Sequence, residues 1–236
     1  MARASGKKEH DMKAPIIERR FHDANPVAKM NRQMLSDAGV FTVSLSGGPG
    51  CGKTTLIEDC IKRLMPDVKV GVIACDVASH LDADRMLRGS DQVVQVNTGQ
   101  QGMPDATHIH DGLHWLDLAK IDLLLIENVG TLVGANLIDL GQDATAAVFS
   151  VAGGHDKVNK HPELVQSADA VILNKTDLLQ AVPFDLQAFR LDVHRHNANA
   201  TLFELSALNG DGMKQWLEWL VTHLKKHQPK TSQWFG

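Results

Sequence analysis

The segment from Gly47 to Thr55 constrains the fold of this chain more than any other. It reads GGPGCGKTT, follows the apolar run at 40–45, and leads into a sequence with helical periodicity. This order of glycines, lysine and threonine between a strand and a helix is typical of a loop that binds phosphate groups. Glycines let backbone N–H groups turn inward around a polyphosphate, and the start of the helix adds a partial positive charge. The sequence therefore predicts a nucleoside triphosphate site.

Two side chains of this phosphate loop have specific expected roles. Lys53 is expected to reach the β- and γ-phosphates and to stabilise the charge that develops on them during hydrolysis. The Thr54 hydroxyl is expected to bind Mg²⁺. The residues expected to surround the nucleotide in this loop are Gly48, Pro49, Gly50, Cys51, Gly52, Lys53, Thr54 and Thr55.

The composition of the chain is that of an ordinary globular domain. Its 236 residues suffice for one sizeable α/β domain, with 43% of them hydrophobic and 22% charged. A net charge of −4 gives no reason to expect nucleic acid or an anionic membrane as a partner. The cysteines form no C-x-x-C pair, no apolar window approaches the length of a membrane span, and the N-terminus lacks a secretory signal. We therefore expect a cytoplasmic protein.

Short apolar runs alternate with helical segments along most of the chain. The segments expected to form strands are 40–45, 68–74, 93–96, 121–126, 146–151, 170–173 and 201–205. The segments expected to form helices are 16–38, with a break at Asn25-Pro26, 53–65, 104–119 and 211–226. This alternation predicts an α/β fold with a doubly wound, mainly parallel sheet of the P-loop NTPase class. We expect a single domain over 16–226, between flexible tails at 1–15 and 227–236.

The segment 174–177 reads NKTD and directly follows the predicted strand at 170–173. In a doubly wound sheet, ligands lie beyond the carboxyl ends of the strands, which is where this segment falls. Guanine offers N1–H and N2–H₂ donors to a carboxylate, whereas adenine presents an acceptor at N1. Asp177 is therefore expected to favour guanine, and the nucleotide is expected to be GTP.

The neighbours of Asp177 have supporting roles in this prediction. Asn174 is expected to hold the loop and to contact the edge of the base, and the Lys175 side chain is expected to lie along the ring. A further backbone contact to the guanine carbonyl is expected from the turn after the last strand, which contains Ser206, Ala207 and Leu208.

Acidic residues follow two other predicted strands. Glu127 comes after the strand at 121–126 and is expected to organise Mg²⁺ through water, while the Gly130 N–H meets the γ-phosphate. Asp76 comes after the strand at 68–74 and is expected either to be a second outer Mg²⁺ ligand or to orient the attacking water. Asp82 and Asp84 are expected to form a solvated charged face.

Ten segments of the chain occur in the order and spacing of a known family. These segments are Asn31-Arg32, 46–55, 75–76, 81–85, 95–99, 126–130, 139–141, 156–157, 174–177 and 205–208. Through them the chain resembles the nickel-insertion GTPases of hydrogenase maturation (HypB type, SIMIBI class) and, less closely, the urease accessory GTPases (UreG type). The resemblance runs from about Phe21 to Leu220. It implies slow GTP hydrolysis gated by homodimerisation, with nickel passed toward a metalloenzyme precursor among other maturation proteins. It also makes Lys157 a candidate for reaching nucleotide across the dimer interface, with an ordinary surface lysine as the alternative.

The chain departs from this family at the residues that would bind nickel or zinc. The family carries a Cys-His pair shortly after Asn-Thr-Gly and a further Cys after the Glu-Asn-Val-Gly turn. The corresponding positions here are Gly102-Met103 and Gly134, so no thiolate remains at either place. His110 and His114, four residues apart on a predicted helix, have a spacing that can hold Ni²⁺ or Zn²⁺. Ordinary surface histidines are the alternative.

Together these features predict an Mg²⁺-dependent GTPase that converts GTP and water to GDP and phosphate. The resemblance implies that it serves as a nickel-insertion accessory protein for a metalloenzyme such as a nickel-iron hydrogenase. The alternative is a GTP-gated switch or scaffold for a different metalloenzyme, one that carries no metal itself. A small-molecule kinase is disfavoured by the NKTD segment.

Overall fold

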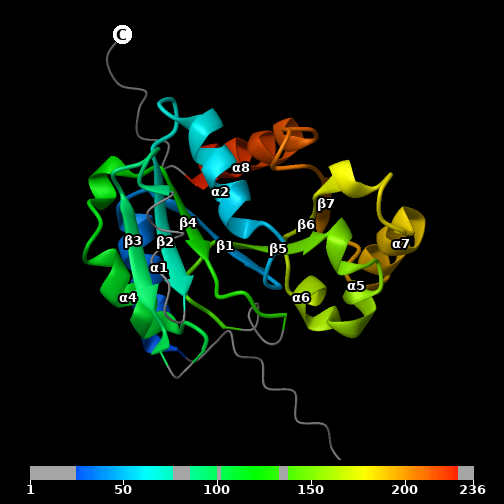
Figure 1. The fold of residues 1–236 in the computed structure, drawn as a ribbon. Helices are drawn as coiled ribbons and strands as arrows, with labels where there is room; N and C mark the ends of the chain where they lie inside the picture. Colours follow the sequence, from blue (N-terminus) through cyan, green and yellow to red (C-terminus); the bar gives the residue numbers. More distant parts are fainter. Residues whose placement is uncertain (1–24, 77–85, 100–101, 133–137, 228–236) are drawn as a thin grey trace, which may run out of the picture.

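The computed structural model describes residues 25–76, 86–99, 102–132 and 138–227 (Figure 1). Within these ranges the chain forms a seven-stranded sheet with the order β3-β2-β4-β1-β5-β6-β7. All of its strand pairs are parallel. The strands are β1 (Phe41–Gly47), β2 (Val70–Asp76), β3 (Val93–Asn97), β4 (Leu123–Glu127), β5 (Ala144–Ser150), β6 (Ala170–Asn174) and β7 (Thr201–Glu204). The predicted parallel sheet and all seven predicted strands are thereby confirmed.

The central strand β1 leads directly into the phosphate loop. It pairs with β4 on one side and β5 on the other, so that Val43 lies opposite Leu125 and Ala144. Every residue of β1 is buried. The strand is covered on both faces, and its apolar residues Phe41, Val43 and Leu45 alternate with the small hydroxyl side chains of Thr42, Ser44 and Ser46.

Two helices cover one face of the sheet. They are α2 (Lys53–Leu64) and α8 (Met213–His227), which lie side by side in Figure 1. Leu56 of α2 and Trp216 of α8 are fully buried in one apolar cluster with Val43 and Leu125. Because side chains alternate across a strand, Leu124 and Ile126 of β4 point to the opposite face.

That opposite face is covered in two parts. Helices α1 (Pro26–Asp37) and α4 (Ala106–Leu113) pack over β2 and β4, with Leu35 and Ile109 buried against Leu124. The short helices α5 (Lys157–Lys160) and α6 (Pro162–Gln166), together with α7 (Leu186–His196), pack over β5 and β6 around Phe189. Figure 1 shows these two groups at opposite ends of the sheet. Helices on both faces make this a doubly wound α/β fold.

The observed helices differ from the predicted ones at several places. Helix α1 begins at Pro26, after Asn25, whose side chain caps it; residues 16–24 of the predicted helix lie outside the described ranges. Helix α4 ends at Leu113, not at 119, because the N–H groups of Trp115 and Leu116 bond three residues back instead of four. Helix α7 was not predicted at all. His227, placed by prediction in the C-terminal tail, is the last residue of α8.

No helix in the described ranges is long and apolar enough to cross a membrane.

Candidate nucleotide-binding site

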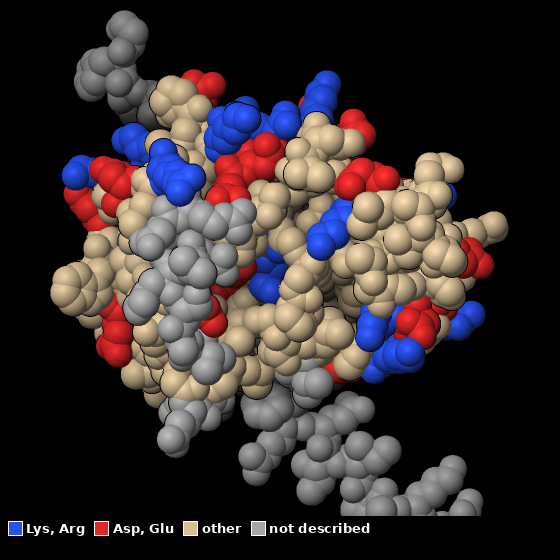
Figure 2. Space-filling model, viewed as in Figure 1, with Lys and Arg blue, Asp and Glu red and all other residues tan. Residues whose placement is uncertain are grey.

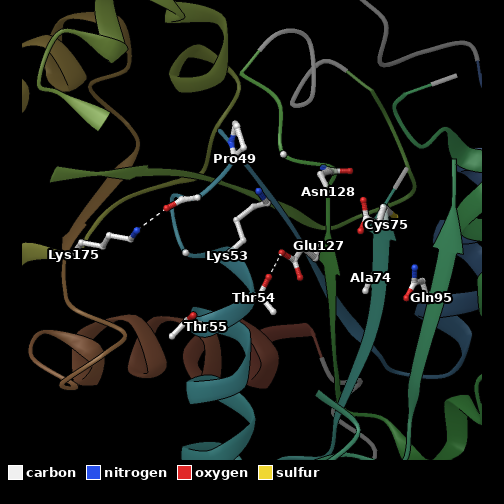
Figure 3. Close-up of a pocket in the computed structure, with 14 residues that line it drawn as sticks. Pro49, Lys53, Thr54, Thr55, Ala74, Cys75, Gln95, Glu127, Asn128 and Lys175 are labelled. Atoms are coloured by element: carbon white, nitrogen blue, oxygen red, sulfur yellow. Dashed lines mark hydrogen bonds between the residues drawn. The ribbon is translucent and has the colours of Figure 1, made fainter. Parts of the chain in front are cut away.

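A pocket of about 470 Å³ opens at the carboxyl ends of β1, β2 and β4 (Figure 3). Its lining residues are Pro49, Gly50, Gly52, Lys53, Thr54, Thr55, Ala74, Cys75, Asp76, Gln95, Glu127, Asn128, Gly130 and Lys175. Figure 2 shows a hollow near the middle of this face, with basic side chains inside it and acidic side chains beside them. The pocket therefore brings the phosphate loop together with the two acidic strand ends that the sequence singled out.

The phosphate loop ends at the first turn of α2. Gly52 is the N-cap residue of α2, and no side chain caps this helix. The first N–H groups of a helix have no partner within the helix, so here they are available to an anion in the pocket. Gly52 also has a φ of 96°, and a Cβ at this position would overlap the side-chain nitrogen of Asn174. Only glycine fits where the two loops approach so closely.

Lys53 and Thr54 follow, and both side chains lie in the pocket. The Lys53 side chain is nearly buried, and its Nζ donates a hydrogen bond of 3.1 Å to the carbonyl oxygen of Gly47. The Thr54 hydroxyl donates a hydrogen bond of 2.7 Å to Oε1 of Glu127, which is drawn in Figure 3. The ammonium group thus lies inside the loop that would surround the phosphates.

The oxygen atoms beside Thr54 form a donor set suited to Mg²⁺. Glu127 ends β4 and is buried, and Asp76 ends β2 and lines the same pocket. A hydroxyl and carboxylates are the ligands that this hard cation prefers, and Mg²⁺ usually keeps several waters besides them. The residues present therefore fit the ion, which Thr54 would bind directly and the two carboxylates would bind through water. Asp82 and Asp84 lie outside the described residues.

Two contacts fix the position of the chain directly after β4 and Glu127. The Asn128 side chain donates hydrogen bonds of 2.8 and 2.7 Å to the hydroxyls of Ser44 and Ser46, all three being buried. Gly130 lies against Pro49 of the phosphate loop, since a Cβ on it would come within 3.0 Å of the Pro49 Cα. These contacts place the Gly130 backbone beside the phosphate loop, where its predicted γ-phosphate contact requires it.

The NKTD segment reaches the phosphate loop through Asn174 and Lys175. Asn174 is buried and donates to the carbonyl oxygen of Cys51 at 3.0 Å. Its own Oδ1 accepts from the backbone N–H groups of Lys175 at 2.7 Å and Ala207 at 3.1 Å. Lys175 has a φ of 61°, rare for a residue with a Cβ, and its Nζ donates to the carbonyl oxygen of Gly50 at 2.7 Å. Figure 3 shows this side chain extending across to the loop.

The other residues predicted to contact the base are Asp177 and the turn after β7. The Ser206 hydroxyl donates to Oδ1 of Asp177 at 2.5 Å, which fixes the carboxylate beside the turn after β7. Leu208 in this turn is 81% exposed. Among the described residues, the lining of the 470 Å³ pocket includes Lys175 but not Asp177 or the Ser206–Leu208 turn. The phosphate and base elements are thus adjacent, with Lys175 between them.

Two polar side chains that line the pocket had no role in the sequence prediction. Gln95 lies on β3 and Asn128 follows β4, and both line the pocket. Ser44 and Ser46, two of the three hydroxyl side chains in the buried strand β1, were the available signal for Asn128. No sequence signal marked Gln95 apart from the family segment that contains it.

The three cysteines are buried, and the described part of the chain contains no group of three or more His, Cys, Asp or Glu side chains that could hold a metal ion. Burial raises the pKa of Cys60 and of Cys75 to about 12 and also raises the pKa of Cys51. Cys60 is buried on α2 and accepts a hydrogen bond from the Trp216 indole. Cys75 lines the pocket wall next to Asp76.

The remaining predicted residues lie away from the pocket. Lys157 is half-buried at the start of α5 and does not line it. His110 lies on α4, and His114 is the residue that caps its C-terminus, with a distance of 3.2 Å between their Nε2 atoms. Gly102 and Met103 are half-buried, whereas Gly134 lies outside the described residues.

Comparisons with known proteins agree with this arrangement. The family model "CobW/HypB/UreG, nucleotide-binding domain" matches residues 41–204. The chain is 37% identical over 200 residues to a probable hydrogenase maturation factor HypB of Methanocaldococcus jannaschii, covering 85% of this chain and 90% of the relative.

Solved structures give the same result. A crystal structure of the hydrogenase maturation factor HypB from Archaeoglobus fulgidus superposes with a TM-score of 0.79 at 35% identity, covering 84% of this chain and 97% of that one. A crystal structure of HypB from Helicobacter pylori in complex with nickel superposes with a TM-score of 0.81 at 27% identity, covering 88% and 98%.

Proposed function

The chain belongs to the CobW/HypB/UreG family of nucleotide-binding proteins, and on that basis we propose that it is an Mg²⁺-dependent GTPase serving in metalloenzyme maturation. One observation carries the choice of GTP. The Asp177 carboxylate is held by the Ser206 hydroxyl, next to the loop that Asn174 ties to the phosphate loop. A carboxylate fixed at this place can accept hydrogen bonds from the N1–H and N2–H₂ groups of guanine. It would be repelled by N1 of adenine, which is itself an acceptor.

Hydrolysis would be carried out by the groups gathered in the pocket. The oxygen of a water molecule bonds to the γ-phosphorus as the bond to the oxygen bridging the β- and γ-phosphates breaks, and GDP, inorganic phosphate and the proton from the water are released. Asp76 orients this water and Lys53 stabilises the charge on the phosphoryl oxygens. Mg²⁺, when bound beside Thr54 and Glu127, neutralises charge on the β- and γ-phosphates. The Gly130 N–H and the first N–H groups of α2 hold the γ-phosphate in place.

The maturation role rests on the relatives. Those reported above include a probable hydrogenase maturation factor, and one related structure is a complex with nickel. We therefore propose a nickel-containing hydrogenase or a similar metalloenzyme as the client, with GTP state setting homodimerisation and docking to the precursor. Lys157 is proposed to reach the partner's nucleotide in that dimer.

A second candidate function is a GTP-gated maturation switch that carries no metal. It is favoured by one observation, namely that Gly102 and Met103 stand where the family has its Cys-His pair. Neither residue offers the thiolate or imidazole ligands that nickel prefers. The two candidates share the GTPase site and differ in whether the chain binds a transition metal.

The GTPase assignment is tested by comparing GTP and ATP turnover, with Mg²⁺, by the full chain and by Asp177→Asn. We expect kcat/KM for GTP to exceed that for ATP at least a hundredfold. In the asparagine variant, kcat/KM for GTP should fall at least tenfold. Its kcat/KM for xanthosine triphosphate should rise, because the 2-oxo group of that base accepts a hydrogen bond from the new amide. Asp67→Asn, in an exposed turn, is the control. Equal turnover of GTP and ATP, or an Asp177→Asn variant that behaves like wild type, would refute the assignment.

The maturation role is tested in cells that lack the gene. Wild-type protein should restore activity of the client hydrogenase, whereas Lys53→Ala should not, and Lys62→Ala, exposed on the same helix, should restore it. Restoration by none of the three would exclude a role in maturing that hydrogenase.

A further inference from the structure

His110 and His114 form a close pair on the surface formed by α1 and α4, away from the nucleotide pocket. Their Nε2 atoms lie 3.2 Å apart, and their ring planes are nearly perpendicular with centroids 4.7 Å apart. His110 is half-buried and His114 is exposed. His114 is the C-cap residue of α4 and lies one turn after His110, so the pair is held by the end of this helix.

Buried Asn31 of α1 determines which nitrogen of His110 carries the proton. Asn31 is fully buried, and its Nδ2 donates hydrogen bonds of 2.8 Å to the Ala106 carbonyl and 3.0 Å to the Leu140 carbonyl. Both amide hydrogens are thereby used, and Oδ1 faces Nδ1 of His110 at 2.9 Å. An amide oxygen only accepts hydrogen bonds, so Nδ1 of His110 must be the donor. Neutral His110 therefore presents a lone pair on Nε2.

This orientation of Asn31 is fixed by its surroundings. The two carbonyls that it binds belong to the first turn of α4 and to the loop before β5. Gly141 in that loop packs so closely that a Cβ there would lie 2.6 Å from the Asn31 Cβ. Exchanging the amide nitrogen and oxygen would place the oxygen against two carbonyl oxygens, which is unfavourable. The tautomer of His110 is thus imposed by the fold.

The resulting geometry is that of two metal ligands. A metal-binding histidine commonly donates its other ring N–H to a carbonyl or carboxylate, which fixes the ring and makes the ligating nitrogen more basic. His110 has this arrangement with the Asn31 side-chain carbonyl. Two metal–nitrogen bonds of about 2.0–2.1 Å at a tetrahedral angle separate their nitrogens by about 3.3 Å. The observed 3.2 Å between Nε2 of His110 and Nε2 of His114 matches this separation.

We propose that His110 and His114 bind one divalent transition metal ion through their Nε2 atoms, with Asn31 as the positioning residue. The described residues contain no group of three or more His, Cys, Asp or Glu that could hold a metal, so water completes the coordination. Imidazole nitrogens select Cu²⁺, Ni²⁺ and Zn²⁺ over Mg²⁺ and Ca²⁺. This site is independent of the GTPase proposal, because none of its three residues lines the nucleotide pocket.

Calorimetric titration of the nucleotide-free full chain with NiCl₂, and separately with ZnCl₂, tests the site. We expect about one ion per chain, and at least tenfold weaker binding for His114→Ala and for His110→Ala. His194→Ala, an exposed histidine on α7, should bind like wild type and controls for scattered surface imidazoles. Equal weakening in all three variants, or no binding by wild type, would overturn the proposal. Because His114 is exposed, His114→Ala should fold even if loss of His110 disturbs Asn31.

Imidazole ¹⁵N NMR tests the role of Asn31 directly. The metal-free protein should show His110 protonated at Nδ1, and Zn²⁺ should shift the Nε2 signals of His110 and His114 together. Protonation of His110 at Nε2, or Zn²⁺-induced shifts confined to other histidines, would contradict the proposal. These readouts need no nucleotide, so a failed GTPase assay would leave them unaffected, and an absent metal site would leave the GTPase proposal standing.

Discussion

The side chain of Asn174 donates a 3.0 Å hydrogen bond to the backbone carbonyl of Cys51, a residue 123 positions earlier in the chain. The same side chain accepts from the backbone N–H groups of Lys175 and Ala207. One buried amide therefore connects the phosphate loop, the NKTD loop and the turn after β7. Since these three segments come from different strands, their relative position depends on this residue.

Replacing Asn174 by aspartate should separate the connected loops. The carboxylate keeps both acceptor contacts but loses the donor, and it faces the Cys51 carbonyl oxygen. We expect the free energy of unfolding to fall by about 1–3 kcal/mol and nucleotide affinity to fall as well. Denaturant unfolding and nucleotide titration measure the two effects. Asn199→Asp places the same charge at an exposed position and should change neither; equal behaviour of the two variants would argue against a connecting role.

Replacing Gly52 by alanine should destabilise the protein more than replacing Gly50 by alanine. Both have positive φ values, 96° and 70°, so each alanine carries a backbone cost of about 1–2 kcal/mol. A Cβ at Gly50 meets nothing within 4 Å, whereas one at Gly52 overlaps the Asn174 side-chain nitrogen. Thermal unfolding of the two nucleotide-free variants should therefore show a larger fall in melting temperature for Gly52→Ala than for Gly50→Ala. Equal losses would mean that the approach of Asn174 is not tight in solution.

Replacing Glu127 by glutamine should affect the metal requirement more than stability. The amide oxygen still accepts from the Thr54 hydroxyl, whose hydrogen bond to Oε1 is 2.7 Å long. The lost negative charge weakens the attraction for Mg²⁺. We expect the Mg²⁺ concentration for half-maximal GTP turnover to rise at least tenfold, without a lower melting temperature. Asp91→Asn, exposed before β3, is the matched control, and an unchanged Mg²⁺ requirement in Glu127→Gln would remove this residue from the metal site.

The three thiols should be unreactive in the native protein. Burial raises the pKa of Cys60 and of Cys75 to about 12, and it also raises the pKa of Cys51, so at pH 8 all three stay protonated. The thiolate is the nucleophile, so a disulfide reagent such as dithionitrobenzoate should react slowly at pH 8. When guanidinium chloride unfolds the protein, all three thiols should react with the reagent at once. One equivalent that reacts within seconds in the native protein would show that a thiol is more accessible than the structure indicates.

The sequence predicted the sheet well because five of its seven strands, namely β1, β2, β4, β5 and β6, are buried along all or nearly all of their length. Such strands read as mainly apolar runs, and each nucleotide motif directly follows one of them. Helix α7 was missed because its segment, LQAFRLDVHRH, buries only Phe189, Asp192 and Val193 among polar residues. The end of α4 was misplaced because Trp115 and Leu116 continue an apolar pattern through a turn.

Contacts between distant segments could not be predicted from local patterns. The hydrogen bonds of Asn31 reach residues 75, 79 and 109 positions away, and the sequence gives no sign that one asparagine contacts all three. The bonds from Asn128 to Ser44 and Ser46 are similar, spanning 84 and 82 positions. The nucleotide motifs were recognisable because their chemistry is local, whereas the side chains that position them are assembled only by the fold.

The place of β1 in the sheet has a consequence for the synthesis of the protein. Val43 pairs with Leu125 and Ala144, which leave the ribosome about eighty and one hundred residues later. Until then the central strand has no neighbour on either side, and the phosphate loop at its end has no framework. The nascent chain should therefore acquire nucleotide only after β5 has emerged. Before that point its apolar central segment is the part most in need of protection by a chaperone.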